Sequence, residues 1–170
     1  MMKEIFSRRS VRKFTGEAVS PEQLEKLLRA AMCAPSAGNQ QPWEFIVVRN
    51  RETMGKIQVF HPYSRPLDTA ACAIVVCGDT TRQRYPGFWV QDCSAAIQNL
   101  LLEAVHLGLG GVWMGVYPAQ QRVQDCQQLF RLPQQIIPLG IVALGYPDEQ
   151  PQPRETYQPQ RIHWESWEEV

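Results

Sequence analysis

Three observations predict that this chain folds as an α+β or α/β sandwich. Apolar residues recur at steps of three and four over 89–107, as they do on one face of a long helix. The segments 43–49 and 70–77 are short apolar runs typical of strands, and the second is apolar throughout, which favours a central place in a sheet. Helices and strands are thus mixed along 170 residues, a length that fits one domain. The periodicity does not settle the order of the strands.

The first part of the chain is predicted to contain two helices. Residues 3–9 can form a short opening helix. Ser20 can cap a second helix, Pro21 suits its first turn and Gln23 completes a capping box. Because proline disfavours helix in the residue before it, this second helix should end near Pro35.

The remaining elements follow in order along the chain. We expect a loop over 35–42, a strand over 43–49, a short helix over 51–58, a strand over 70–77, a polar loop over 79–88, the long helix over 89–107, a strand over 111–117, a helix over 119–130 and a strand over 138–145. Gly108 should stop the long helix. From Pro147 the chain is rich in proline and glutamine and then aromatic. We therefore expect one domain over 1–147, with residues 148–170 as an extended C-terminal tail of the same domain.

Composition and charge argue against several classes of protein. Lys plus Arg equals Asp plus Glu at 17 each, which does not favour a nucleic-acid or anionic-membrane binder. No stretch approaches the roughly 18 apolar residues that span a bilayer, and the polar segment 1–10 does not resemble a secretory signal. Five cysteines form no C-x-x-C pair, and Cys72 and Cys77 lie in an apolar run where cysteine is usually buried. We expect a reduced, cytoplasmic protein without a disulfide framework, a nucleic-acid partner or a membrane partner.

Arginines gather in the segment Arg8-Arg9-Ser10-Val11-Arg12. Guanidinium groups form bidentate hydrogen bonds to phosphate oxygens, so three of them beside a hydroxyl suit a phosphate or another polyanion. The alternative is a solvated basic end of the opening helix that complements the helix dipole. Arg154 stands in the proline-rich tail with Arg161 beyond it, and arginines in such tails are usually solvated.

The loop that leads into the strand over 43–49 combines a stiff backbone with polar side chains. Pro35 and Pro42 limit its flexibility, and Gly38 permits unusual backbone angles. Its donors and acceptors are Ser36, Asn39 and Gln41. Such a loop can read the polar edge of a heterocycle. Alternatively, it is a helix-to-strand connector whose side chains bond within the loop.

The segment 108–116 is rich in glycine but is not a dinucleotide fingerprint. It has no glycine at position 113, and it follows a helix where the fingerprint would follow a strand. Closely spaced glycines allow a backbone to approach a flat ligand, whereas the alternative is a helix stop followed by a strand.

Other catalytic patterns are absent from the sequence. Its three histidines lack zinc-ligand spacing, and neither a G-x-S-x-G elbow nor a Walker loop occurs. Asp92 and Glu103 lie eleven residues apart on the long helix, too far for a carboxylate dyad. The sequence therefore indicates neither a metal site nor hydrolytic machinery.

Taken in order, these segments resemble the nitroreductase family of FMN enzymes. The likeness runs from about Ile5 to Trp167. Its most specific motifs are R-R-S-V-R-x-F at 8–14 and P-S-x-x-N-x-Q-P-W at 35–43, followed by the long helix, the glycine-rich strand start and L-G-Y-P at 144–147. The resemblance implies an α+β three-layer sandwich with a central mixed sheet, assembled as an intertwined homodimer with two FMN molecules at its interface.

The resemblance also implies which residues hold FMN. Arg8 and Arg9 would address the phosphate and the ribityl chain with Ser10 beside them, and Arg12 would lie near the pyrimidine edge. The partner subunit would supply Pro35, Ser36 and Asn39, the backbone of Met114, Gly115 and Val116 would line the ring, and Arg154 would return to the phosphate. Family members often carry two basic residues two positions apart in the tail. Here Thr156 stands at the second place, so either Arg161 compensates or phosphate binding depends more on Arg8.

The implied activity is hydride transfer from NADH or NADPH through FMN to a small acceptor such as a nitroaromatic or a quinone. Because no dinucleotide domain is present, donor and acceptor would use one site in turn, in a ping-pong mechanism. Arg12 is the candidate for a fixed cation that stabilises negative charge on the flavin, and no side chain is assigned a catalytic acid–base role. The alternatives are an FMN storage or sensing protein, a flavin-fragmenting relative, and a dehalogenase, whose usual lid would be too long for residues 79–88.

Overall fold

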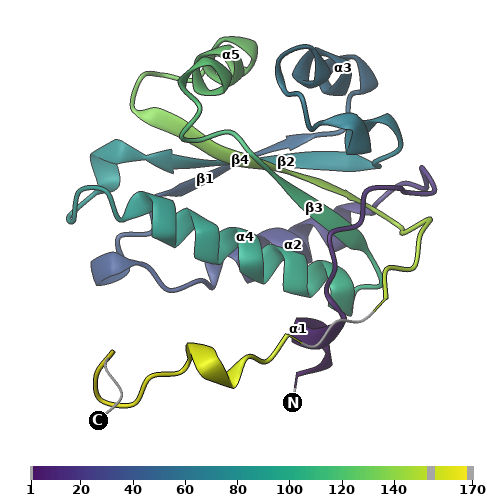
Figure 1. Ribbon diagram of the computed structural model, residues 1–170. Coiled ribbons are helices and arrows are strands. Elements are labelled where there is room, and N and C mark those ends of the chain that lie inside the picture. The colour runs from purple at the N-terminus through teal and green to yellow at the C-terminus, as the bar shows by residue number, and fades with distance from the viewer. Residues whose placement is uncertain (1, 153–155, 168–170) are drawn as a thin grey trace.

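Four strands form one sheet that lies between two layers of helices (Figure 1). The computed structural model describes residues 2–152 and 156–167. The strands are β1 (Trp43–Val48), β2 (Cys72–Asp79), β3 (Gly110–Gly115) and β4 (Ile136–Gly145). Helices α2 (Pro21–Met32) and α4 (Trp89–His106) cover one face, α3 (Arg51–Phe60) and α5 (Gln120–Phe130) cover the other, and the short α1 (Lys3–Ser7) contacts α4. The expected three-layer α+β sandwich is confirmed.

The strand order is β1-β2-β4-β3, and all three pairings are antiparallel. The expectation of a mixed sheet is therefore wrong for the described strands. β2 and β3 do run in the same direction and are joined through α4, but β4 lies between them and pairs with both. Within the described residues, parallel pairing is limited to an isolated bridge between Ser10 and Gly111. β2 is an interior strand, as its apolar run predicts, and β1 and β3 are the edges.

The helix ends follow the capping residues of the sequence. The Ser20 side chain accepts a hydrogen bond from the N–H of Gln23, whose side chain accepts one from the N–H of Ser20, so the capping box is confirmed. Asn50 caps α3 through the N–H of Thr53. Gly108 has a φ of +73° and turns the chain from α4 toward β3. The other boundaries lie within about two residues of those expected.

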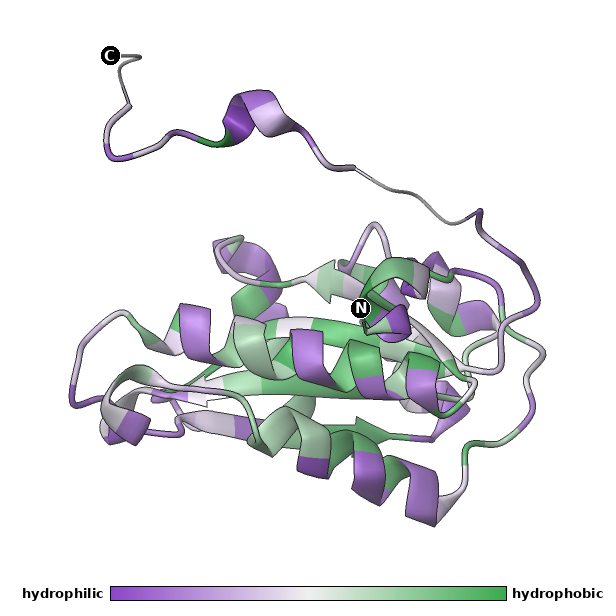
Figure 2. Cartoon of the chain, turned by 90° about the horizontal axis from the view of Figure 1, so that it is seen from below, coloured by the Kyte–Doolittle hydropathy of each residue, from purple (hydrophilic) through white to green (hydrophobic). Residues whose placement is uncertain are grey.

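Two apolar clusters fill the space on the two sides of the sheet, one under α2 and α4 and the other under α3 and α5. Ile74 and Val76 belong to the first cluster, whereas Val75 and Cys77 belong to the second. β2 is apolar from Cys72 to Cys77 because both of its faces are buried there. The strands are mostly hydrophobic, whereas the helices in front of them carry both hydrophobic and hydrophilic residues (Figure 2).

All five cysteines are free, and Cys33 is the exposed one. Burial raises the pKa of the Cys72 thiol to about 11, and it raises the pKa of Cys93 and of Cys126 to about 12. These buried thiols stay protonated and do not act as nucleophiles.

Residues 156–167 of the C-terminal tail extend away from the layers (Figure 2). They expose the rings of Tyr157, Trp164 and Trp167. Among the described residues, no helix combines the length and the apolar character that a membrane crossing requires.

Candidate functional site

The basic segment 8–12 lies beside the start of the edge strand β3. Ser10 pairs with Gly111 in the parallel bridge, and the N–H of Val11 donates to the Gly111 carbonyl at 3.1 Å. Phe14 forms a second bridge with Pro147, just after β4. Main-chain contacts therefore fix this segment to the sheet, and its polar side chains are not needed for that attachment.

The arginines of this segment differ in their partners. Arg9 donates through Nε to the Gln152 carbonyl at 2.9 Å and through Nη1 to the Arg8 carbonyl at 2.8 Å. Its Nη2 is buried and has no hydrogen-bond partner among the described residues. Arg12 is exposed, and its Nη1 donates to the Ser10 carbonyl at 3.3 Å.

No carboxylate of the described residues forms an ion pair with any of these three arginines. The buried Nη2 of Arg9, which has no partner among the described residues, fits an anion such as a phosphate.

At the other end of β3, two side chains hold the carbonyl of Gly115. His61 Nε2 donates to it at 2.9 Å, and Arg122 Nη1 donates at 3.2 Å. His61 is buried, and its Nδ1 accepts from the N–H of Tyr63 at 3.3 Å, which assigns the ring proton to Nε2. Burial lowers the pKa of His61 and so favours this neutral form. The Gly115 carbonyl is therefore fixed, although glycine has the freest backbone of all residues.

Between these two ends β3 has an open edge. The N–H of Val116 donates to the Leu139 carbonyl at 3.0 Å, and hydrogen-bonded pairs alternate along an antiparallel ladder. The N–H groups of Trp113 and Gly115 therefore point away from β4, toward the side on which Gly111 meets residues 8–12. This edge runs for about 13 Å from Gly111 to Gly115 at the usual rise of a strand.

The glycines of segment 108–116 separate into two groups. Gly108 needs its positive φ, and a Cβ at Gly110 or Gly111 would lie within 2.9 Å of a neighbouring side chain. A helix stop and close packing therefore account for these three. Gly115 has no positive φ, and a Cβ there would meet nothing within 4 Å. The space beside Gly115 fits a flat ligand that lies against the backbone.

A cavity of about 660 Å³ adjoins Arg12, and its wall carries charges of both signs: Lys13 and Arg65 line it together with Asp68, Asp148 and Glu149. The Glu149 carboxylate accepts from the N–H groups of Arg12 and Lys13, which fixes the backbone at this wall. Arg65 begins the turn η2 (Arg65–Asp68) and adds a basic side chain that the sequence analysis missed. No neighbouring motif marks Arg65, because its proximity to Arg12 arises only in the folded chain.

The loop 35–42 has an unusual backbone. Gly38, Asn39 and Gln41 have φ values of +54°, +55° and +46°, and two of these residues are not glycine. Such conformations are uncommon and persist only where the surroundings hold them. Ser36 contributes through its Oγ, which accepts from the N–H of Gln41 at 3.0 Å. Bonds within the loop therefore exist, as the connector interpretation expects.

A buried carboxylate of α4 also holds this loop. Asp92 Oδ1 accepts from the N–H of Ala37 at 3.0 Å, and Oδ2 accepts from Gln40 Nε2 at 2.6 Å. Gln40 Oε1 accepts in turn from the N–H groups of Arg84 at 3.0 Å and Tyr85 at 3.2 Å. In the sequence Asp92 stands out only as a possible half of a carboxylate dyad, and no motif marks this network.

One chain does not bring the two halves of the predicted site together. Residues 8–12 lie at the start of the edge strand β3, whereas the loop 35–42 leads into β1 at the opposite edge (Figure 1). β1 begins level with Gly78 of β2, whereas Gly111 is level with Cys72, six residues earlier in β2. The loop and the basic segment are three strand spacings apart across the sheet and six residues apart along the strands. The distance between them is therefore about 25 Å.

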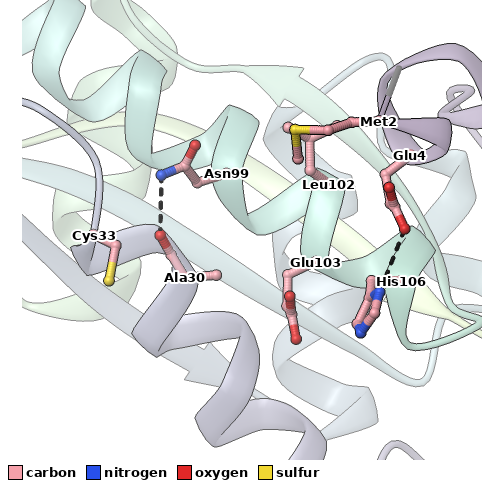
Figure 3. A pocket seen from close by; sticks show the side chains of 8 residues that line it. All are labelled: Met2, Glu4, Ala30, Cys33, Asn99, Leu102, Glu103 and His106. Atoms are coloured by element: carbon pink, nitrogen blue, oxygen red, sulfur yellow. Dashed lines mark hydrogen bonds and ion pairs between the residues drawn. The ribbon is translucent and has the colours of Figure 1, made fainter.

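A separate cavity of about 380 Å³ lies between α1, α2 and α4 and contains none of the predicted site residues (Figure 3). Its lining residues are Met2, Glu4, Ala30, Cys33, Asn99, Leu102, Glu103 and His106. Asn99 donates to the Ala30 carbonyl at 3.1 Å across one side, and Glu4 and His106 approach to 3.4 Å on another. Near this cavity, Ile5 and Phe6 of α1 and Met32 of α2 are exposed apolar side chains.

Arg154 lies outside the described residues, and its role in phosphate binding stays a prediction. Arg9 holds the chain at Gln152, shortly before it. Thr156 and Arg161 are described and exposed, and Arg161 belongs to the turn η4 (Pro159–Arg161).

The sequence profile of the nitroreductase family matches residues 5–63 and 61–146. A Methanothermobacter thermautotrophicus protein with the provisional name NADH dehydrogenase/NAD(P)H nitroreductase is 50% identical over 167 residues, which cover 98% of this chain and 87% of that protein.

Solved structures share the fold over nearly the whole chain. An FMN-dependent nitroreductase from Clostridium difficile R20291 has a TM-score of 0.90 at 27% identity, with 98% of this chain and 100% of that chain covered. The NADPH:FMN oxidoreductase from Vibrio harveyi, solved in complex with NAD+, has a TM-score of 0.86 at 25% identity, with 99% and 78% covered.

Proposed function

Because the chain belongs to the nitroreductase family, we propose that it is an FMN-dependent oxidoreductase that passes a hydride from NADH or NADPH to a small acceptor. Bound FMN supplies the hydride chemistry, and the protein supplies binding, orientation and electrostatics. The five free cysteines support a cytoplasmic location.

The open edge of β3 supports one orientation of the cofactor. The phosphate and ribityl chain would lie beside Arg8, Arg9 and Ser10, where a buried guanidinium nitrogen lacks a partner among the described residues. The ring would lie against the backbone of 114–116, where the space beside Gly115 is open. The side chains of Met114 and Val116 are buried in the core, so only their backbone would reach the ring.

Arg12 would face the pyrimidine edge of the ring, and Arg65 is a second cation on the same cavity, which Asp68, Asp148 and Glu149 also line. Fixed positive charge at this edge stabilises negative charge that develops there during hydride transfer. No side chain is required to move a proton in this scheme, and the buried thiols, whose pKa values are raised, are unsuited to do so.

The observation that carries the proposal is the position of the loop 35–42 at the edge of the sheet opposite to residues 8–12. Because the loop lies about 25 Å from the basic segment of its own chain, a second copy of the chain would supply Pro35, Ser36 and Asn39 to this flavin site. We therefore expect a homodimer in which each site combines the β3 edge of one protomer with the loop 35–42 of its partner.

Exposed apolar side chains support this assembly. Ile5 and Phe6 of α1 are 50% and 42% exposed, and Trp164 and Trp167 of the tail are each 81% exposed. Monomeric proteins rarely leave such groups of large apolar side chains in water. Residues 148–170 would then act as a tail of the same domain that wraps the partner subunit.

The acceptor is expected to be a small molecule such as a nitroaromatic or a quinone. One site must serve donor and acceptor in turn, because no second nucleotide domain is present in the described fold. A site that is open on one side selects its acceptor weakly, since few groups are desolvated and matched to one ligand.

Three measurements test this function. Flavin released by heat or acid from the purified protein should be FMN, and NADH or NADPH should bleach its absorbance in an anaerobic stopped-flow experiment. Initial rates with both substrates varied should then give parallel double-reciprocal lines. Failure to bind FMN would refute the flavin site, absence of reduction would favour a storage protein, and intersecting lines would contradict the shared site.

A further inference from the structure

The proposed reaction does not use Asp92, although its side chain is buried at 4% exposure. The residue lies in the first turn of α4, and its two oxygens accept from Ala37 and from Gln40. A buried carboxylate is costly unless it is hydrogen-bonded, and here both oxygens are bonded to one loop. The contact partners therefore indicate that Asp92 serves the conformation of residues 35–42.

Gln40 extends this connection to a second loop. Its side chain is also buried, and it joins Asp92 on one side to the N–H groups of Arg84 and Tyr85 on the other. The ring of Tyr85 packs on Gly38, where an added Cβ would lie only 2.5 Å from the ring. The loops 35–42 and 79–88 are thus joined by one amide and one ring.

The direction of every hydrogen bond in this network is determined by chemistry. The Asp92 carboxylate can only accept, so the Gln40 amide must turn its nitrogen toward it. The Gln40 oxygen then faces two backbone N–H groups, which can only donate. If one acceptor in this network is replaced by a donor, or one donor by an acceptor, then two donors or two acceptors face each other.

The network holds a backbone that is unfavourable by itself. Asn39 and Gln41 each adopt positive φ without being glycine, at a cost of roughly 1 kcal/mol or more per residue. Asp92 and Gln40 bond on both sides of Asn39, at Ala37 and at position 40 itself. Without these bonds the loop would relax toward ordinary backbone angles and lose the orientation of Ser36 and Asn39.

We propose that Asp92, acting through Gln40, is a positioning residue for the flavin site of the partner subunit. The inference rests on the proposed function, because it assigns loop 35–42 to that site. Asp92 sets the shape of the loop without touching the cofactor, and Gln40 makes the same shape depend on residues 84 and 85.

The test exchanges donor and acceptor between the two side chains. Asp92→Asn turns an amide nitrogen toward another donor, and Gln40→Glu turns a carboxyl group toward Asp92. Each single variant should raise the Kd for FMN by about 10- to 100-fold, since a buried polar group loses its partner.

The double variant D92N/Q40E restores the pairing in the opposite sense. The amide introduced at position 92 accepts from the N–H of Ala37 and donates to the carboxylate introduced at position 40, which still accepts from residues 84 and 85. The double variant has the charge of the wild type and should recover its Kd to within about threefold.

FMN affinity is measured by fluorescence titration of the apoprotein, together with its unfolding temperature and mass in solution. Asp125→Asn, which changes a carboxylate of α5 that accepts from Gln121 outside the network, is the control and should leave the Kd unchanged. Single variants that unfold at lower temperature yet keep the wild-type Kd would show a merely structural role and overturn the inference. So would a double variant that binds FMN as poorly as the singles.

If a single variant does not fold, Gln40→Met takes its place, because it keeps the volume and removes only the polar amide. An unchanged Kd in Gln40→Met overturns the inference as well. A wild-type protein that binds no FMN refutes the proposed function itself, so the two failures are distinguished.

Discussion

The two halves of the proposed flavin site are built by different means. The β3 edge is held by the main-chain ladder of the sheet and by the bridge at Ser10, and no residue of the strand has a positive φ. The loop 35–42 has three residues at positive φ and depends on side chains from distant elements. At the edge, charge and free space decide what binds, whereas in the loop individual hydrogen bonds decide the shape.

Loss of charge should affect the β3 edge most strongly. Arg8→Ala removes a guanidinium that is expected to donate to the phosphate, and the Kd for FMN should rise about 10- to 150-fold, equivalent to about 1.5–3 kcal/mol. Fluorescence titration measures the change. Arg29→Ala is the control, because Arg29 is exposed and pairs with Glu25 at 2.7 Å, away from the β3 edge. An Arg8→Ala protein that binds FMN as the wild type does would remove Arg8 from the site.

Substitution by alanine should affect different properties at two glycines of β3, the stability of the fold at Gly110 and FMN binding at Gly115. A Cβ at Gly110 would lie 2.8 Å from Val11, so Gly110→Ala should destabilise the fold by about 1–3 kcal/mol. Gly115→Ala meets open space and should leave the stability nearly unchanged while it weakens FMN binding. Chemical denaturation and FMN titration of both variants compare the two effects. Unchanged FMN affinity in Gly115→Ala would mean that the ring does not approach this backbone.

His61, which lies at the far end of β3, should make the free energy of unfolding depend modestly on pH. Burial lowers its pKa from the ordinary value of 6.5, so below that value the unfolded chain binds more protons than the native one. The contribution of neutral His61 to stability is therefore complete at pH values above its pKa in the unfolded chain. It is lost as the pH falls through the lower pKa of His61 in the folded protein. Denaturation between about pH 8 and about pH 5 should show a larger loss in the wild type than in His61→Gln, whose amide can donate to Gly115 at either pH. Equal losses would mean that His61 is not held neutral.

Local patterns predicted most of the secondary structure, because each depends on neighbours in sequence. The capping box at Ser20 and Gln23, the stop at Gly108 and the buried run of β2 are examples. The mixed sheet, which the resemblance implied, is wrong for the described strands, because β4 lies between β2 and β3 and pairs antiparallel with both. Periodicity left the strand order open, since it contains no information on topology.

The candidate site was predicted through its motifs, and the residues around those motifs were missed. Asp92 meets Gln40 across 52 positions, and His61 meets Gly115 across 54, so no local pattern connects either pair. Arg65 reaches the cavity of Arg12 only because η2 folds against the start of the chain. Such residues become visible only when the fold places distant segments side by side.

The central claim is that each flavin site combines the β3 edge of one protomer with the loop 35–42 of its partner. A mixed dimer tests it, with Arg8→Ala in one chain and Gly38→Val in the other, each carrying its own affinity tag. Gly38→Val disrupts the loop, because the residue has a φ of +54° and its Cβ would collide with Tyr85.

Both parent homodimers should bind FMN poorly, since each carries its defect in both sites. In the mixed dimer the two defects fall in the same site, and the other site pairs an intact Arg8 with an intact loop. The mixed dimer should bind about one FMN tightly, as measured by titration of the doubly purified protein. A mixed dimer that binds FMN no better than its parents would contradict the account, because each chain would then build its own site.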